Sequence, residues 1–276
     1  MSALLDIANL RVTFPTPRGP IEVVKGVSFT LGRERLGIVG ESGSGKSMTG
    51  RAILKLIRAP GRVTADRLSF DGIDLLALPE RQMRAIRGAR ISMVMQDPKF
   101  SLNPVMTIGS QIAEALLTHQ KLARGDIRKR VRAMLEAVRI DDPDRVARLY
   151  PHEVSGGMGQ RVMIAMMLIP EPDLLIADEP TSALDVSVQA QVLDIIDELV
   201  RRTGMGLIFI SHDLNLVSSY CDRILVMRGG EVVEECAAGQ LGNATHPYTR
   251  GLIAAIPRID ETRDELPVLD RSGWAA

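Results

Sequence analysis

The chain of 276 residues has few cysteines, no net charge and no long apolar run. Its two cysteines, Cys221 and Cys236, lie outside every motif described below and form no metal-type pair, so they fit free thiols in a reducing cytoplasm. Lysine plus arginine and aspartate plus glutamate both number 34, which gives a formal net charge of +0. Because nucleic-acid binding relies on a positive field, we expect no nucleic-acid partner.

Membrane-spanning and secretory patterns are also missing. No apolar run approaches the ~18 residues that a spanning helix needs. The N-terminus, Met1–Asp6, has no basic stretch and reaches an acid at once, so we expect no secretory signal. Any membrane role would therefore come through a partner. The composition, 45% hydrophobic and 25% charged, is ordinary for a globular protein with one large α/β domain or a core with a subdomain.

The most informative stretch is Gly40–Ser47, here named the phosphate loop. It fits G-x-x-x-x-G-K-[ST], the pattern of phosphate-binding loops. The apolar residues 36–39 precede it, as a buried strand should, and the helix-compatible residues 48–57 follow it. Gly43 and Gly45 allow backbone geometry that a Cβ would block, so successive N–H groups can turn toward phosphate oxygens.

The side chains of the loop suit the same ligand. The helix that follows points its partially positive N-terminus at the anion, and Lys46 supplies a full positive charge to the β- and γ-phosphates. The hydroxyl of Ser47 can ligate Mg²⁺. The residues expected to bind ATP here are Gly40, Glu41, Ser42, Gly43, Ser44, Gly45, Lys46 and Ser47.

Short apolar segments alternate with amphipathic ones along the chain. Strands are expected at 4–14, 21–30, 36–39, 67–70, 91–96, 174–177, 206–210, 224–227 and 231–233, and helices at 126–138 and 187–202. This alternation predicts an α/β fold with a mainly parallel sheet, an N-terminal antiparallel β part and a mostly helical insertion over 97–157.

A second chemical signal is the apolar strand Leu174–Ala177, which runs into Asp178 and Glu179. Asp178, at the end of the strand, is suited to hold the Mg²⁺ shell across from Ser47. Glu179 is suited to polarise a water for attack on the γ-phosphate. The pair turns a general nucleotide-phosphate signal into a prediction of hydrolysis.

Further motifs occur in a fixed order. Gln96 follows an apolar strand, the signature stretch Ser155–Arg161 precedes a helix, Ser182–Asp185 follows the carboxylate pair, and His212 follows another strand. Their order and spacing resemble the ATP-binding cassette (ABC) family over roughly residues 4–256. The resemblance implies a P-loop NTPase core at 1–96 and 158–256, a helical signature subdomain at 97–157 and a tail at 257–276.

The resemblance also implies roles within one ATP site, with Mg²⁺ as cofactor. Phe14 looks like the aromatic residue that stacks on adenine. Gln96 looks like the glutamine that contacts Mg²⁺ or the attacking water, which with Ser47 and Asp178 completes the metal set. His212 looks like the histidine that holds the γ-phosphate and the catalytic Glu179.

Other roles cross a subunit interface. Ser155, Gly156 and Gly157 look like the signature residues that contact the γ-phosphate bound by an opposite subunit, and Asp185 looks like a residue that couples the two subunits. The implied active form is therefore a dimer that closes on ATP and opens after hydrolysis.

Several segments resemble one branch of this family, the dipeptide, oligopeptide and nickel importers. They are Gln96–Pro104, Gln160–Met166, Ala177–Val186 and Thr245–Leu252, together with Met158. The branch implies a second ATPase subunit, often a paralogue, two transmembrane permease subunits and an external solute-binding protein. It places the chain on the cytoplasmic face of the inner membrane. Many members carry a cysteine-rich C-terminal segment that can hold an iron–sulfur cluster; this chain ends without one, so we expect no cluster.

Peptide import is the leading hypothesis, and nickel import by the same machinery is its close alternative. A soluble cassette ATPase acting on DNA or ribosomes usually has two cassettes or a long coiled-coil insertion, neither of which the pattern contains. A regulatory nucleotide binder without turnover would lack Glu179, His212 or a signature glycine, and all of these are present.

Overall fold

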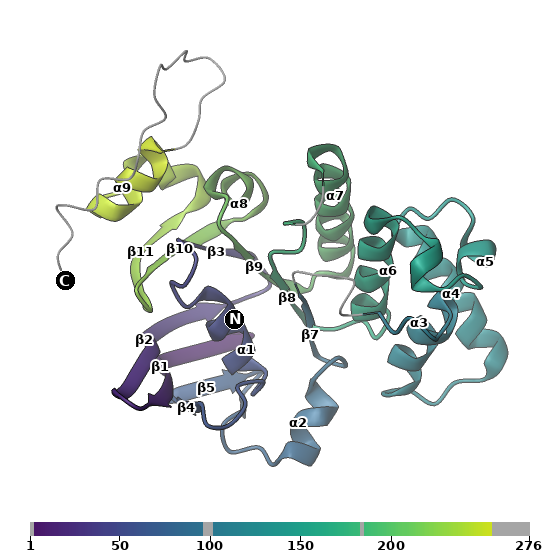
Figure 1. Cartoon of the computed structure of the whole chain (residues 1–276), viewed down its shortest axis with the longest axis horizontal. Coiled ribbons are helices and arrows are strands. Elements are labelled where there is room, and N and C mark those ends of the chain that lie inside the picture. The colour runs from purple at the N-terminus through teal and green to yellow at the C-terminus, as the bar shows by residue number, and fades with distance from the viewer. Residues whose placement is uncertain (1–2, 96–101, 183–184, 256–276) are drawn as a thin grey trace. The chain divides into compact units, whose positions relative to one another are not determined.

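The computed structural model describes residues 3–95, 102–182 and 185–255 (Figure 1). The chain divides into two compact units. The first comprises Met1–Leu76 and Phe209–Ala276, and the second comprises Ala77–Ile208. Strand β9, Gly206–Ser211, contains the second boundary between them. Within the described ranges, no helix is both long and apolar enough to cross a membrane.

An antiparallel sheet occupies the N-terminal part of the first unit. Its strands are β1 (Leu5–Thr16), β2 (Gly19–Leu31), β4 (Arg62–Thr64), β5 (Arg67–Phe70) and β6 (Ile73–Asp74). β1 pairs antiparallel with β2, β4 and β5. Side chains of β1 and β2 that are apolar and point to one face, such as Leu5, Val12 and Leu31, are fully buried. The predicted antiparallel part is therefore confirmed.

The same unit contains parallel pairing next to the phosphate loop. β3 (Arg35–Val39) pairs parallel with β10 (Arg223–Arg228), and β10 pairs antiparallel with β11 (Glu231–Ala237). Helices in this unit are α1 (Lys46–Ile53), α8 (Leu214–Tyr220) and α9 (Pro247–Ala254), with the 3₁₀ helix η3 (Ala238–Asn243). A Cβ at Gly37 would lie 2.0 Å from a methyl carbon of Val217, so this glycine lets α8 pack directly against β3.

The second unit combines two parallel strands with a group of helices. β7 (Ile91–Val94) and β8 (Leu174–Asp178) pair in parallel, and every residue of both is buried, which explains their unbroken apolar character. The helices are α2 (Glu80–Ile86), α3 (Ile108–Leu117), α4 (Arg124–Ala137), α5 (Pro143–Val146), α6 (Gly156–Leu168) and α7 (Val186–Thr203), with the 3₁₀ helix η2 (Pro151–Glu153). Figure 1 shows α3, α4, α5 and α6 gathered together in this unit.

The predicted elements match this architecture closely. The α/β class and the helical content of the insertion are confirmed, and the helices expected at 126–138 and 187–202 are α4 and α7. The short helices α2, α8 and α9 were not predicted. Each has only seven or eight residues, which is too short for a clear apolar period. The division of residues 1–256 into a core and a signature subdomain stays a prediction.

Candidate functional site

The phosphate loop connects β3 to α1 in the first unit. Three of its glycines have positive φ angles, which are 151° at Gly40, 84° at Gly43 and 98° at Gly45. A Cβ at Gly40 would lie 2.1 Å from the carbonyl oxygen of Met227, and one at Gly45 would lie 2.6 Å from that of Val23. Glycine is therefore required at both positions for steric reasons as well as conformational ones.

The side chain of Lys46 forms hydrogen bonds with the backbone of its own loop. Its side chain is 5% exposed, and its ammonium nitrogen donates hydrogen bonds to the carbonyl oxygens of Gly40, at 2.7 Å, and Glu41, at 2.8 Å. Lys46 is also the first residue of α1, so the ammonium and the helix N-terminus both lie at the loop. These groups fit a phosphate, because a cation and helix N–H groups are the donors that an anion needs. Ser47 follows directly and is partly exposed.

Two other segments of the same unit hold the loop in shape. The N–H of Gly230, in the turn between β10 and β11, donates to the carbonyl oxygen of Ser44 at 3.1 Å. The N–H of Glu41 donates to the hydroxyl of Tyr248 on α9 at 3.0 Å. Neither contact was predicted. The available signal for the second was the segment Thr245–Leu252, which the sequence marked as typical of one branch without giving it a role.

Phe14 and His212 belong to the same unit as the phosphate loop. Phe14 lies near the end of β1, opposite Ile21, and its ring is partly exposed and packs against Gly61. His212 follows β9 directly and is exposed. Their predicted contacts with adenine and with the γ-phosphate stay predictions.

The carboxylate pair lies in the second unit, at the end of β8. Asp178 is the last residue of the strand and is 4% exposed. Glu179 is partly exposed and has φ +47°, in the left-handed region, which costs a non-glycine residue about 1–2 kcal/mol. The N–H and the hydroxyl of Ser182 both donate to its carbonyl oxygen, at 3.3 and 3.2 Å. These bonds stabilise a tight turn that fixes the direction in which Glu179 leaves the strand.

The signature stretch begins α6 in the same unit. Ser155 is the N-cap, and its hydroxyl accepts a hydrogen bond from the N–H of Met158 at 3.3 Å. Ser155 and Gly156 are exposed, so the first turn of the helix is open to a partner. A Cβ at Gly157 would lie 2.7 Å from a methyl carbon of Val188, so this glycine lets α6 approach α7 closely.

The other predicted residues divide between the described and undescribed parts of the chain. Asp185 is the exposed N-cap residue of α7, and its carbonyl oxygen accepts the N–H groups of Val188 and Gln189. Gln96 lies outside the described residues. The second unit therefore contains the carboxylate pair, the signature stretch and Asp185, and the first unit contains the phosphate loop, Phe14 and His212.

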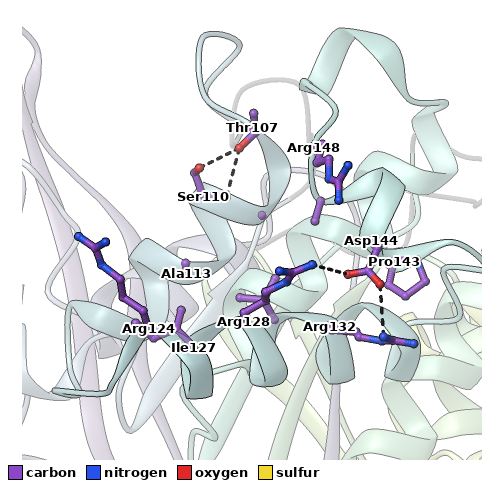
Figure 2. A pocket seen from close by; sticks show the side chains of 13 residues that line it. Thr107, Ser110, Ala113, Arg124, Ile127, Arg128, Arg132, Pro143, Asp144 and Arg148 are labelled. Carbon is purple, nitrogen blue, oxygen red and sulfur yellow. Dashed lines mark hydrogen bonds and ion pairs between the residues drawn. The ribbon is translucent and has the colours of Figure 1, made fainter.

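A basic pocket of about 430 Å³ lies within the second unit, between α3, α4 and α5 (Figure 2). Its charged lining residues are Arg124, Arg128, Arg132, Arg148 and Asp144. Asp144 pairs with Arg132 at 3.3 Å and, more distantly, with Arg128 at 3.8 Å. The side chains of Arg124 and Arg148 have no hydrogen bond or ion pair within the described ranges. The apolar lining is formed by Ala113, Ile127, Val131, Pro143 and Ala147.

Two features define a P-loop nucleoside triphosphatase. One is a glycine-rich loop that precedes a helix, and the other is a buried strand that leads into two carboxylates. The family model described as "ABC transporter" matches residues 24–182. The chain belongs to the ABC transporter family and is an ATPase of that family, as the sequence predicted.

Named relatives cover almost the whole chain. The dipeptide transport ATP-binding protein DppD of Bacillus subtilis (strain 168) is 46% identical over 273 residues, which is 98% of this chain and 82% of that protein. The oligopeptide transport ATP-binding protein OppD of Escherichia coli (strain K12) is 46% identical over 266 residues, which is 94% of this chain and 77% of that protein. The dimeric post-hydrolysis structure of the ATP-binding cassette MJ0796, bound to ADP and Pi, has a TM-score of 0.74 at 28% identity and covers 85% of this chain and 98% of its own. These likenesses confirm the predicted P-loop NTPase fold.

Proposed function

We propose that this chain energises a bacterial importer for dipeptides or oligopeptides by binding and hydrolysing ATP. The observation that carries the proposal is 46% identity to a dipeptide transport ATP-binding protein over 98% of the chain. The oligopeptide relative supports the same substrate class. Nickel import by the same kind of assembly is the alternative, since the ATPase itself does not contact the cargo in the mechanism that the resemblance implies.

The residues that would hold ATP are those of the phosphate loop, with Phe14 against the adenine. The buried ammonium of Lys46 and the N-terminus of α1 supply the positive charge that the phosphates need. Ser47, Gln96 and Asp178 would hold Mg²⁺, which would neutralise negative charge on the phosphates. When bound, ATP supplies the γ-phosphoryl group whose transfer to water drives the cycle.

Glu179 is proposed as the base that orients and deprotonates the attacking water, with His212 on the γ-phosphate. The turn closed by Ser182 supports this role, because it fixes the backbone from which the carboxylate projects. Without that constraint, a surface carboxylate would sample many directions and contribute little to water activation.

Exposed residues of the second unit support a second ATPase subunit as partner. The open first turn of α6, with Ser155, Gly156 and Gly157, would contact ATP bound by a second ATPase subunit, and Asp185 would couple the two subunits. This second subunit is proposed to be a paralogue. Two permease subunits and an external solute-binding protein would complete the importer, with this chain on the cytoplasmic face of the inner membrane.

The basic pocket is the proposed attachment point for a permease. Arg124 and Arg148 carry positive charge without a carboxylate partner in the described ranges, while several other lining residues are apolar. An amphipathic segment that presents an acidic side chain beside apolar ones would match both properties. Asp144 shows that the pocket can hold a carboxylate, since it already pairs with two arginines of α4.

Uptake experiments test the proposed function. The gene would be deleted in its host, and uptake of labelled dipeptides, oligopeptides and nickel would be compared with rescue by the parent and by Lys46→Ala. Loss of peptide uptake that only the parent rescues is the expected result. Loss of nickel uptake alone would assign the chain to the alternative, and unchanged uptake in a host without a redundant importer would contradict both.

A further inference from the structure

We propose that Tyr248 is a positioning residue of the phosphate loop, through which α9 and the residues before it control the affinity for nucleotide. The proposal rests on the assignment of the phosphate loop to ATP made above. It gives a role to the segment Ala244–Ala254, here named the C-terminal segment, that neither the sequence motifs nor the proposed mechanism assigns.

The central observation concerns the peptide unit that joins Gly40 to Glu41. Its carbonyl oxygen accepts a hydrogen bond from the ammonium of Lys46 at 2.7 Å, and its N–H donates to the hydroxyl of Tyr248 at 3.0 Å. Because a peptide unit is planar and trans, its C=O and N–H point in opposite directions. One peptide plane is therefore held from both sides, by the lysine that would bind phosphate and by a tyrosine that lies 207 positions from Glu41.

The two hydrogen bonds support each other. Donation from the N–H polarises the peptide unit and makes its carbonyl oxygen a better acceptor for Lys46, an effect that is stronger in a buried environment. Tyr248 is 1% exposed and Lys46 is 5% exposed, so water does not readily replace either bond. If the tyrosine hydroxyl is removed, the peptide unit can rotate, and the ammonium loses its fixed position over the loop.

The ring of Tyr248 is itself fixed by its neighbours. The guanidinium carbon of Arg228, at the end of β10, lies 5.5 Å from the centre of the ring, within range of a cation–π interaction. The turn after Arg228 contains Gly230, whose N–H reaches Ser44 of the loop. The tyrosine and the β10–β11 turn therefore hold the phosphate loop at two points, Glu41 and Ser44.

The start of the C-terminal segment is attached to β11 by one carboxylate. Glu234 accepts hydrogen bonds from the N–H of Thr245 at 2.6 Å, from its hydroxyl at 3.1 Å and from the N–H of His246 at 3.3 Å. The ring nitrogen Nδ1 of His246 then accepts the N–H of Tyr248 at 3.2 Å and caps α9. A continuous series of contacts thus runs from Glu234 through His246 and Tyr248 to the phosphate loop.

The competing explanation is that Tyr248 only fills the core beneath α9. The variant Tyr248→Phe separates the two explanations, because it keeps the ring, its packing and the contact with Arg228 and removes only the hydroxyl. Positioning predicts that ATP and ADP bind about three- to ten-fold more weakly, because fewer molecules hold the loop in its binding conformation. If Tyr248 only fills the core, the variant should bind both nucleotides like the parent, because the packing is kept.

The measurement is the Kd for ATP and ADP, by calorimetry on the full chain, together with thermal unfolding without nucleotide. The parent and the variants Tyr248→Phe, Lys46→Ala and Tyr248→Phe/Lys46→Ala form a double-mutant cycle. Because Tyr248 is proposed to act through the peptide unit that holds Lys46, its effect should disappear in the Lys46→Ala background. Tyr150→Phe is the matched control, since it removes a hydroxyl from a tyrosine that is 39% exposed and lies in the other unit.

The outcomes separate this inference from the function on which it rests. If the parent does not bind ATP, or if Lys46→Ala binds as tightly as the parent, the assignment of the phosphate loop fails. If those controls behave as expected and Tyr248→Phe binds ATP like the parent, the positioning role is overturned. An equal effect of Tyr248→Phe with and without Lys46 would overturn it as well.

A second variant tests the series of contacts without changing Tyr248. Glu234→Gln weakens the attachment of Thr245 and His246 to β11, and the positioning role predicts weaker ATP binding in the same direction as Tyr248→Phe. The neighbouring Glu235→Gln is the control, because Glu235 pairs with Arg223 and makes no hydrogen bond to the described part of the C-terminal segment. If Glu234→Gln leaves ATP affinity unchanged, the C-terminal segment does not act on the loop.

Discussion

The side-chain amide of Gln160, on α6, donates a hydrogen bond to the carbonyl oxygen of Pro180, the residue that follows Glu179. Gln160 is 1% exposed, so this bond joins the helix that begins at the signature stretch to the turn that carries the proposed base. Both residues belong to the second unit. A contact of this kind makes the position of Glu179 depend on the position of α6.

Replacing Gln160 with leucine should therefore lower both stability and turnover. Leucine has a similar size but leaves the carbonyl of Pro180 buried without a donor, at a cost of about 1–3 kcal/mol. Thermal unfolding and steady-state ATP hydrolysis measure the two effects. Gln82→Leu, at an exposed position of α2, is the control and should change neither. A Gln160→Leu protein with parental kcat would show that the link does not orient Glu179.

Replacing Glu179 with glutamine should keep ATP binding and reduce turnover by roughly 10²–10⁴-fold, because a general base is lost while the shape of the turn is kept. The variant should also trap a closed dimer with ATP, which size-exclusion chromatography would detect. Glu171→Gln is a close control, since Glu171 has a similar left-handed backbone, with φ +62° against +47°. Parental hydrolysis by Glu179→Gln would show that the base is a different residue.

Replacement by alanine should have different effects on stability at the two signature glycines, Gly156 and Gly157. A Cβ at Gly157 would meet Val188, so Gly157→Ala should destabilise the second unit by about 1–3 kcal/mol. A Cβ at Gly156 would meet nothing within 4 Å, so Gly156→Ala should keep or slightly raise the melting temperature, since alanine favours a helix. If the Gly156→Ala protein is stable but no longer dimerises with ATP, the added methyl group acts at the subunit interface and not on folding.

Charge reversal in the basic pocket should separate attachment to the permease from catalysis. Arg124→Glu/Arg148→Glu should leave the ATPase rate of the isolated chain unchanged, because neither side chain has a partner in the described ranges and neither belongs to the proposed ATP site. The same change should prevent copurification with the permease subunits and abolish peptide uptake. Lys121→Glu/Lys129→Glu is the control. It changes the net charge by the same amount, but at exposed residues that do not line the pocket. Normal uptake with the arginine variant would exclude the pocket as the attachment point.

The two thiols should differ in reactivity. Burial raises the pKa of Cys221 from its ordinary value of 9.0 to about 12, and burial also raises the pKa of the more accessible Cys236. Native protein at pH 8 should therefore react with an alkylating reagent at Cys236 first and at Cys221 only after unfolding, as mass spectrometry would show. The folded state favours the protonated Cys221 thiol, so its contribution to stability is complete below pH 9 and falls as the pH rises toward 12. In Cys221→Ala this part of the pH dependence should be absent.

The sequence predicted those parts of the fold and site that depend on residues close to one another in the chain. The phosphate loop was found because its glycines, Lys46 and the flanking strand and helix occur together in the chain, and Asp178 was found because an apolar strand ends there. The contacts that hold these motifs in place join distant residues, as between Glu41 and Tyr248, Ser44 and Gly230, and Gln160 and Pro180. No local pattern reveals such pairs, since any buried tyrosine or glutamine has many possible partners.

The contact between Gly230 and Ser44 has a consequence for synthesis of the protein. The phosphate loop is translated before the turn that closes against it, which lies between β10 and β11, and Tyr248 comes later still. A nascent chain on the ribosome therefore carries the full motif long before it carries the groups that shape it. Nucleotide binding should begin only when β10, β11 and α9 have emerged, well after the phosphate loop itself.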